Sequence, residues 1–390
     1  MNPHGLRVTM PDRLTLGIDV GTSATKVLLL KSDSSWEMHV WPSSEDLWSN
    51  LREWLGNRGQ HIERLGITTH GPSAVVIRDG ELCGRVIPWH EDLPDGCDRN
   101  PEGEQVLPQT RAWVPARLAQ WELENGPVGD GIAVQLKDFY NWQLTNVIAR
   151  DSRSMRGYVG VGHFHLPEDV IGRVSKQGAE LSGISQGAEV ICGCDDLTAG
   201  VIGLGAVDGV LFNLANTSEH VGLVGGFSQE NMSWLPPIGR LPSLCYNATS
   251  TDANTIMKDR MQEVEDVRSK FPAGEMWIGG GWAMNSQLVA SRGAIRKAGQ
   301  EVSALGVAKL ARRRPVAVIF GAGKVGRGFL AQLLNRAGWD FSLVDSHEET
   351  VNALRQQDGW DVYNLKMETN EHLQARQIRH FDDNLYEVLA

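Results

Sequence analysis

One stretch near the N-terminus decides the fold: Leu16-Gly17-Ile18-Asp19-Val20-Gly21-Thr22-Ser23-Ala24-Thr25-Lys26-Val27-Leu28-Leu29-Leu30. Two apolar runs flank a short Gly-Thr-Ser turn. Apolar runs of this length, bounded by turn residues, predict the two strands of a tight hairpin over 15–20 and 25–30.

The turn of this hairpin carries residues that suit phosphate. Gly21 permits backbone geometry that other residues resist, and it lets amide groups approach an anion closely. Asp19 ends the first strand, where it could hold a hydrated Mg²⁺, and Thr22 and Lys26 could reach phosphate oxygens. The spacing is not that of a Walker loop. The alternative is an ordinary hairpin with one lysine on its exposed face.

Composition bounds the class of protein. The chain has 390 residues, 41% hydrophobic and 22% charged, which is typical of a globular protein with two or three domains. A net charge of −11 argues against nucleic-acid and anionic-membrane partners. No apolar run approaches the roughly 20 residues that span a bilayer.

Residues 1–13 lack an apolar signal segment and are expected to form a leader. Five scattered cysteines fit a reducing, cytoplasmic compartment.

Periodicity predicts alternating strands and helices along the rest of the chain. Further strands are expected over 64–70, 74–77, 85–89, 132–136, 190–194, 210–214, 220–224 and 276–278. Helices are expected over 47–55, 112–123, 137–145, 168–174, 197–204, 252–270 and 302–311. The turn Asn216-Thr217-Ser218 between two strands repeats the opening arrangement, which is how a two-lobed nucleotide cleft can be built. The composition changes at Arg312-Arg313-Arg314, which we take as a linker.

Four stretches, taken in order, resemble the FGGY family of carbohydrate kinases, the xylulokinase and gluconokinase type. They are Gly17-Ile18-Asp19-Val20-Gly21-Thr22-Ser23 with Lys26; Lys137-Asp138-Phe139 with Leu144-Thr145 and Asp151-Ser152; Gly193-Cys194-Asp195-Asp196 with Ala199-Gly200 and Gly203-Leu204-Gly205; and Gly279-Gly280-Gly281 with Asn285 and Ala304-Leu305-Gly306-Val307-Ala308.

The resemblance implies an α/β fold of the actin and hexokinase type, with lobes over 14–190 and 191–311. It also implies ATP and Mg²⁺ as cofactors, with a small sugar or polyol as substrate in the cleft between the lobes. Asp196 matches the family's general base, which takes the proton of a sugar hydroxyl. Asp195 is the alternative base, and either residue could instead be a helix N-cap.

The resemblance also assigns the binding residues. ATP contacts are implied for Asp19, Gly21, Thr22, Lys26, Thr217, Ser218, Gly279, Gly280, Gly281 and Asn285, with Asp19 near the metal. Substrate contacts are implied for His70, Trp89 and Glu91, although His70 and Glu91 could equally lie in solvated loops.

Two departures from the family pattern bear on activity. The second phosphate turn reads Asn216-Thr217-Ser218-Glu219 where the family has Gly-Thr-Ser-Gly, and Glu219 is expected to bring negative charge near phosphate. The second lobe is also short for the family, and a reduced lobe is expected to close less well over ATP. A non-catalytic sugar- and nucleotide-binding protein, or a degenerate fusion, is therefore an alternative to an active kinase.

The C-terminal segment, 315–390, opens with a strand, a Gly-x-Gly-x-x-Gly turn at Gly321, Gly323 and Gly326, and a helix. The next strand ends in Asp345. This is the dinucleotide fingerprint in its required context, with Asp345 placed to bind ribose hydroxyls and to favour NAD over NADP. The alternative is a βαβ unit that binds nothing.

The same segment resembles the N-terminus of mannitol-1-phosphate 5-dehydrogenase and related polyol dehydrogenases, through the Gly-Arg-Gly-Phe continuation and Asp358-Gly359-Trp360-Asp361-Val362-Tyr363. It holds about half of a dinucleotide fold, so we expect a partial Rossmann domain. Such a domain could serve as an oxidoreductase component that needs a partner chain. Half a parallel sheet leaves an edge open, and we expect the kinase part, a second copy of the chain or a partner chain to cover it.

Overall fold

The computed structural model describes residues 14–97, 114–155, 164–216, 219–230, 232–248, 257–313, 316–336, 339–357, 359–364 and 369–383. The predicted leader and parts of the predicted helices over 112–123 and 252–270 lie outside these residues. The chain forms two compact units, Met1–Arg312 and Arg313–Ala390, which are described separately. Among the described residues, no helix is both long and apolar enough to cross a membrane.

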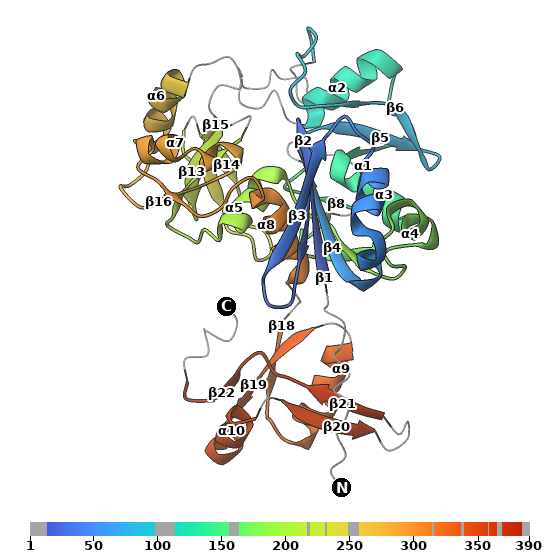
Figure 1. The fold of residues 1–390 in the computed structure, drawn as a ribbon, viewed down its shortest axis with the longest axis vertical. Coiled ribbons are helices and arrows are strands. Elements are labelled where there is room, and N and C mark those ends of the chain that lie inside the picture. The colour runs from blue at the N-terminus through green and yellow to red at the C-terminus, as the bar shows by residue number, and fades with distance from the viewer. Residues whose placement is uncertain are drawn as a thin grey trace. The chain divides into compact units, whose positions relative to one another are not determined.

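The first lobe of unit 1 is built on a six-stranded sheet in the order β10-β11-β4-β1-β2-β3 (Figure 1). The strands are β1 (Leu14–Val20), β2 (Ala24–Leu30), β3 (Trp36–Pro42), β4 (Ile62–Thr69), β10 (Val170–Arg173) and β11 (Glu189–Ile191). β1, β2 and β3 form an antiparallel meander, and β4 and β11 continue the sheet parallel to β1. The opening stretch therefore forms the predicted hairpin at the centre of this sheet.

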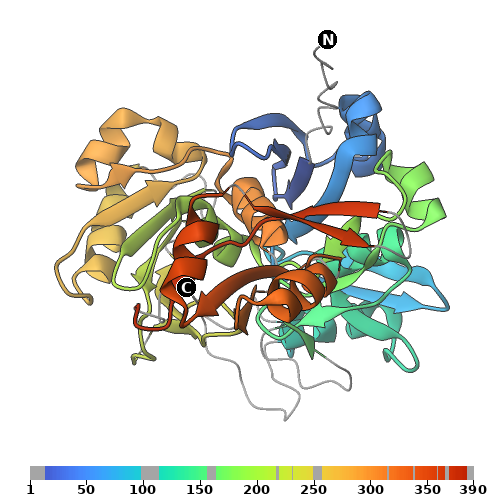
Figure 2. The same ribbon diagram turned by 90° about the horizontal axis from the view of Figure 1, so that it is seen from below.

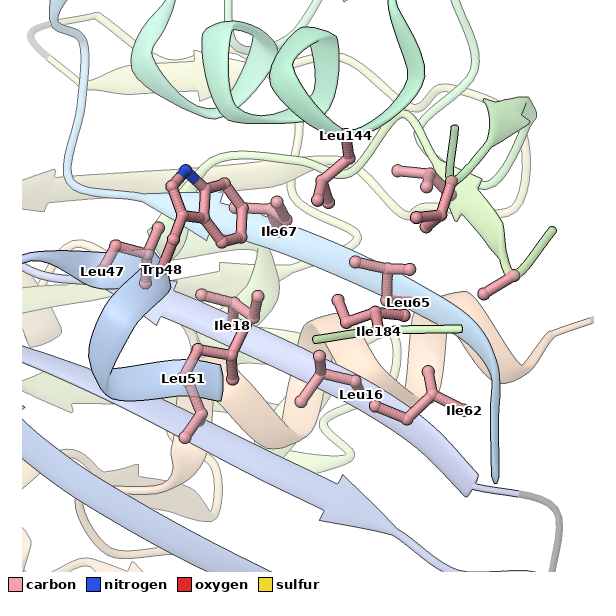
Figure 3. Packing of buried hydrophobic residues seen from close by; sticks show 14 of the residues in the cluster. Leu16, Ile18, Leu47, Trp48, Leu51, Ile62, Leu65, Ile67, Leu144 and Ile184 are labelled. Carbon is pink, nitrogen blue, oxygen red and sulfur yellow. The ribbon is translucent and has the colours of Figure 1, made fainter. Parts of the chain in front are cut away.

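Helix α1 (Leu47–Leu55) covers one face of this sheet. Its N-cap Asp46 accepts a hydrogen bond from the Ser49 backbone N–H, and a cap of this kind fixes where a helix begins. Apolar residues recur at helical spacing, so the helix turns one face onto the strands (Figure 3). The members of this cluster that Figure 3 labels are Leu16, Ile18, Leu47, Trp48, Leu51, Ile62, Leu65, Ile67, Leu144 and Ile184.

The second lobe repeats the plan of the first with a sheet in the order β14-β15-β13-β12-β16-β17. Its strands are β12 (Leu211–Ala215), β13 (Glu219–Val224), β14 (Ser233–Leu235), β15 (Leu244–Ala248), β16 (Met276–Gly279) and β17 (Ile295–Arg296). β12, β13 and β15 form the antiparallel meander, and β16 and β17 continue parallel to β12. The weak sequence echo between the two turns thus reflects a structural repeat.

Two helices lie between the sheets: α5 (Asp196–Leu204) and α8 (Val302–Arg312) (Figure 1). α8 packs on β1, β2 and β4, whereas α5 packs on β12 and β16, and the two helices contact each other along their length. Glycines allow this close approach. A Cβ atom on Gly306 would collide with the carbonyl oxygen of Ala199, and one on Gly203 would collide with that of Val302.

The remaining elements of unit 1 flank the two sheets. They are η1 (Gly56–His61), β5 (Ala74–Arg78), β6 (Glu81–Ile87), α2 (Val114–Asn125), β7 (Ile132–Gln135), α3 (Leu136–Thr145), β8 (Arg150–Asp151), β9 (Phe164–His165), α4 (Lys176–Ser182), α6 (Met257–Arg268), η3 (Gly281–Met284) and α7 (Ser286–Ser291). β5, β6 and β7 form a small sheet of their own.

One predicted element of unit 1 is wrong. The segment 168–174 is not a helix, because Val170–Arg173 forms edge strand β10, which pairs antiparallel with β11. The helix begins later, where the Ser175 side chain accepts a hydrogen bond from the Gly178 N–H and caps α4.

Unit 2 has a three-stranded parallel sheet in the order β18-β19-β22, with a separate hairpin β20-β21 (Figure 2). Its elements are β18 (Val316–Phe320), the π-helix η4 (Lys324–Leu330), α9 (Ala331–Arg336), β19 (Asp340–Asp345), α10 (Glu348–Arg355), β20 (Trp360–Asn364), β21 (Thr369–Leu373) and β22 (Ile378–His380). Leu343 and Phe341 of the middle strand, with Ile319 and Leu354, form its core.

Candidate functional site

Asp19 and Lys26 form an ion pair across the opening hairpin. The Lys26 Nζ lies 3.0 Å from Asp19 Oδ2, and the two residues face each other in the register of β1 and β2. Asp19 is nearly buried, and its charge raises the pKa of Lys26, with Asp196 adding to the effect. Because only one Asp19 oxygen is occupied by Lys26, the carboxylate retains an oxygen that a hydrated Mg²⁺ would accept as a ligand.

Asp195 and Asp196 have different roles at the start of α5. Asp195 is the N-cap, because its carboxylate accepts the Thr198 backbone N–H at 2.8 Å and the Thr198 hydroxyl at 2.7 Å. Asp196 is partly exposed and accepts only the backbone N–H of Leu197 among the described residues. Burial raises the pKa of Asp196 to about 8, and the charges of Asp195 and Asp19 act in the same direction. Asp196 is therefore the carboxyl group of this pair that is suited to exchange a proton near neutral pH.

The turn of the first lobe at Gly21 and Thr22, which is predicted to bind phosphate, is held by side chains from two other segments. The Ser43 hydroxyl donates to the Gly21 carbonyl at 2.8 Å. The Trp89 indole Nε1–H donates to the Thr22 hydroxyl at 3.1 Å. Since Thr22 accepts this bond, its own hydroxyl proton is left to donate to an anion.

His70 lies close enough to Asp19 for the Asp19 charge to act on it. Its Nδ1 is 3.0 Å from the Ser73 hydroxyl, and its ring lies 6.3 Å from that of His90, which in turn contacts Trp89. Burial and the charge of His90 lower the pKa of His70, which the Asp19 charge partly opposes, to about 4. His70 is thus a neutral imidazole next to Asp19, able to donate or accept one hydrogen bond.

The Glu91 carboxylate is held by other side chains and does not face Asp19, Lys26 and Asp196. Both of its carboxylate oxygens are held by Arg85, at 2.6 and 2.8 Å, and Gln120 donates to one of them. Buried Arg117 on α2, a residue that our sequence analysis did not single out, donates to the carbonyls of Trp89 and Glu91 and so fixes this loop. Arg117 lies 26–28 positions away from those partners, so no local pattern signals the contact.

The second turn that is predicted to bind phosphate differs from expectation at Glu219. The expectation that Glu219 brings negative charge near phosphate is wrong, because Glu219 is buried and forms an ion pair at 3.1 Å with Arg292, which is also buried. Asn213 donates a further hydrogen bond to it. Thr217 and Ser218, the predicted phosphate contacts of this turn, lie outside the described residues.

Asn216 joins this turn to the glycine turn that follows β16. Its side-chain oxygen accepts the Gly281 N–H at 3.0 Å, and a Cβ atom on Gly280 would meet that oxygen and the Ala215 carbonyl. Gly279 ends the buried strand, whereas a Cβ atom on Gly281 would meet open space. The glycines thus bring the two turns of the second lobe together and leave one side open.

The residues after this turn divide into a structural and an exposed set. Asn285, a predicted ATP contact, is the N-cap of α7 and accepts the N–H groups of Gln287 and Leu288. Trp282 and Met284 are 49% and 61% exposed, so two large apolar side chains stand at the surface beside the open turn. Sequence analysis missed both, and their proximity to Gly281 is the signal that could have found them.

A buried cluster in the first lobe contains residue types that can bind a metal ion. Asp138, Asp151 and Cys192 place ligand atoms within 4.8 Å of one another. The Lys137 ammonium group already pairs with both carboxylates, and Asp151 lies 2.8 Å from it. Burial raises the pKa of the Cys192 thiol, which keeps it protonated. The cluster is therefore a lysine ion-pair site that holds α3 to the end of β11.

The glycine turn of unit 2 keeps the spacing that a dinucleotide requires. Gly321 has a φ of +98°, and a Cβ atom on Gly326 would collide with the Gly321 carbonyl, so strand and helix meet at these two glycines. Gly323 faces open space. Asp345 accepts the N–H groups of Ala322 and His347, and these bonds lower the pKa of its carboxyl group.

Comparison with known proteins identifies the type of unit 2. Residues 315–388 match the family model described as the Rossmann domain of mannitol dehydrogenase. A stretch of 49 residues is 43% identical to mannitol-1-phosphate 5-dehydrogenase of Arthrobacter sp. (strain FB24). That stretch is 13% of this chain and 13% of the curated relative, so the chain spans only a small part of that protein.

Solved structures of sugar kinases share the fold of unit 1. Xylulose kinase from Rhodospirillum rubrum superposes with a TM-score of 0.61 at 14% identity, over 77% of this chain and 89% of its own. Gluconate kinase from Lactobacillus acidophilus gives 0.62 at 13%, with the same coverage. Glycerol kinase from Plasmodium falciparum, solved with ADP, gives 0.58 at 11%, over 76% and 88%. The chain therefore joins a sugar-kinase fold to a mannitol-dehydrogenase-type Rossmann domain.

Proposed function

We propose that unit 1 is an ATP-dependent carbohydrate kinase that transfers the γ-phosphoryl group to a hydroxyl of a sugar or polyol. The fold, which it shares with sugar kinases, makes this class the first to consider. The observation that carries the proposal is the difference between the two aspartates of α5. Asp195 uses its carboxylate to cap the helix, whereas the Asp196 carboxylate accepts only the Leu197 backbone N–H among the described residues and lies close enough to Asp19 and Lys26 for their charges to act on it.

The residues present fit Mg²⁺ and ATP. Asp19 offers one carboxylate oxygen, and Mg²⁺ commonly keeps several waters and takes only one or two protein carboxylates. The turn at Gly21–Thr22 and the open turn at Gly281 would hold the nucleotide. Bound Mg²⁺-ATP supplies the phosphoryl group and neutralises its charge.

The side chains would then divide the work of phosphoryl transfer. Asp196 takes the proton of the attacking hydroxyl on its carboxylate. Lys26 and the Thr22 hydroxyl orient phosphate oxygens, and the exposed face of Trp282 supports the adenine ring. Neutral His70 and the Trp89 loop, held by Arg117, bind sugar hydroxyls. Such transfer depends mainly on positioning and charge stabilisation, which is what this arrangement offers.

A panel assay of the full chain tests this proposal. ADP formation is followed with Mg²⁺-ATP and each of several pentuloses, hexuloses, polyols and aldonates. We expect one class of acceptor to stimulate ADP formation well above the rate without sugar. Retained ligand-induced stabilisation without any sugar-dependent turnover would instead identify a non-catalytic binding protein.

For unit 2 we propose NAD binding, supported by the strand–glycine turn–helix unit and by the family match. Gly321 and Gly323 would admit the pyrophosphate, and Asp345 would turn from its loop amides to the ribose hydroxyls. Fluorescence titration with NADH tests this, and Asp345→Ala should weaken NADH more than NADPH. Equal binding of both by the wild type would contradict the assignment of Asp345.

A further inference from the structure

The second turn that is predicted to bind phosphate is tied at both ends to one other segment of the second lobe. The turn begins at Asn216, after β12, and ends at Glu219, where β13 starts. The Asn216 side-chain oxygen accepts the Gly281 N–H at 3.0 Å, and the Glu219 carboxylate pairs with Arg292 at 3.1 Å. Both partners belong to the segment 281–292, which contains η3 and α7 (Figure 1).

Arg292 is a firmly held anchor for this attachment. It is the C-cap of α7, and its N–H donates to the Leu288 carbonyl at 3.1 Å. Its own carbonyl accepts a hydrogen bond at 3.0 Å from the guanidinium of Arg268, at the end of α6. The side chains of Arg292 and Glu219 are almost fully buried, so water does not compete for the ion pair. The Glu219 end of the turn is therefore fixed to a well-held part of the lobe.

The chemistry of this ion pair favours a positioning role. Taking two charges out of water costs free energy, and a buried ion pair often stabilises a fold no better than apolar side chains of similar volume. The Arg292 Nε finds no hydrogen-bond acceptor among the described residues, so the desolvation of this guanidinium is only partly compensated. An ion pair differs from apolar packing in its direction, because it fixes which atoms of two segments face each other.

The two attachments join parts of the nucleotide site of the proposed kinase. Gly280, with a φ of +109°, leaves room for the Asn216 oxygen, since a Cβ atom on Gly280 would meet that oxygen at 2.6 Å. Gly281 is open on one side, and Trp282 beside it is exposed. The segment proposed to hold the nucleotide is thus the one that receives both bonds. Two turns joined in this way are already ordered relative to each other before the nucleotide binds.

We propose, on the basis of the proposed function, that Asn216 and Glu219 are positioning residues of the nucleotide site. They hold the turn 216–219 and the glycine turn 279–281 in one preorganised arrangement. Asn216 acts through the Gly281 N–H and Glu219 acts through Arg292, so neither side chain has to touch the nucleotide. The two positions at which the chain departs from Gly-Thr-Ser-Gly thereby share one role, because each replaces a glycine by a side chain that attaches the turn.

Isothermal titration calorimetry of the full chain with Mg²⁺ and ADP tests this proposal without requiring turnover. In Glu219→Met/Arg292→Met two apolar side chains replace the ion pair, and the melting temperature should stay close to that of wild type. The Kd for ADP should nevertheless rise about tenfold, because nucleotide binding must then order the turn. Glu219→Gln keeps an oxygen that accepts from Arg292 and should bind ADP within about threefold of wild type.

The matched control is the ion pair between Arg64 and Glu189 in the first lobe, at 2.8 Å. Arg64 lies near the start of β4, at the opposite end of that strand from His70. Arg64→Met/Glu189→Met should therefore bind ADP like wild type. Asn216→Ala removes the other attachment at a partly exposed position, and we expect it to raise the Kd for ADP about tenfold as well.

The outcomes separate this proposal from the proposed function. Unchanged ADP binding in Asn216→Ala, or in a folded Glu219→Met/Arg292→Met chain, would overturn the positioning role. So would an equal loss of affinity in Glu219→Gln or in the first-lobe control, since that would reflect a general loss of stability. A wild-type chain that binds no ADP in the presence of Mg²⁺ would overturn the proposed nucleotide site itself, and this inference with it.

Discussion

Asp196 is a residue whose surroundings oppose its own charge. Its pKa is raised to about 8, first by burial and then by Asp195 and Asp19. The folded chain therefore holds the Asp196 proton more tightly than the unfolded chain, whose aspartates titrate near 3.9. The contribution of this group to stability falls as pH rises from about 4 and levels off above about 8.

Removing this carboxyl group should stabilise the fold in a pH-dependent way. We predict that Asp196→Asn melts at a higher temperature than wild type at pH 8, and that the difference shrinks toward pH 5. Thermal melts at several pH values measure this, with Asp195→Asn as control, because asparagine also caps helices. A difference that does not depend on pH would contradict the environment described for Asp196.

Trp282 offers an exposed aromatic face beside the open glycine turn. Trp282→Ala should raise the KM for ATP about tenfold, since stacking on a base is worth about 1–3 kcal/mol, and leave the KM for the sugar unchanged. Steady-state kinetics with each substrate varied in turn make the measurement. Trp36→Ala, which removes another exposed tryptophan on β3, should change neither value.

Single residues show where sequence analysis stops. Asp19, Lys26, His70 and Asp196 could be named because each stands next to a turn or a strand end that local pattern marks. Arg117 could not be named, because its partners are far from it in sequence and only the packing of α2 brings them together. The consequence of Glu219 was mispredicted for the same reason, since its counter-ion Arg292 lies 73 positions away.

At the scale of elements, the helix pair α5 and α8 connects the two sheets. The glycines of these helices belong to the motifs quoted above. They also have a physical role, because no side chain fits where the two helices touch. The hairpin β1–β2 was predictable since its signal is local. Edge strand β10 was not, because its apolar residues fit helical spacing and only its pairing with β11 decides between the two.

Gly306→Ala tests the role of this helix pair. The added methyl group would collide with the Ala199 backbone, so we predict a loss of about 1–3 kcal/mol or more in the free energy of unfolding of unit 1. Urea unfolding followed by tryptophan fluorescence measures it. Gly274→Ala is the control, because a Cβ atom there meets atoms only at 3.9 and 4.0 Å. Equal stability of the two variants would show that the helices are less closely packed than described.

At the scale of the whole molecule, the order of four motifs was enough to predict the two-lobed kinase fold, and one fingerprint was enough to predict the Rossmann unit. The duplication of the sheets was hardly visible in the sequence, since the two turns share only Thr-Ser. The strand orders of the two sheets show the duplication, because both sheets follow the same plan although their side chains differ. The candidate ligand residues of unit 1 come from several of these elements, which is why local pattern indicated only some of the contacts among them.

The central claim is that Asp196 is the base of a sugar kinase, and one comparison of kcat tests it most directly. With the acceptor found in the panel, sugar-dependent ADP formation is measured for wild type, Asp196→Asn and Asp195→Asn. We predict that Asp196→Asn loses about 10²–10⁴-fold in kcat while its KM for ATP stays close to that of wild type. Asp195→Asn, whose cap survives, should lose less than about tenfold. Wild-type activity in Asp196→Asn, or an equal loss in both variants, would contradict the account.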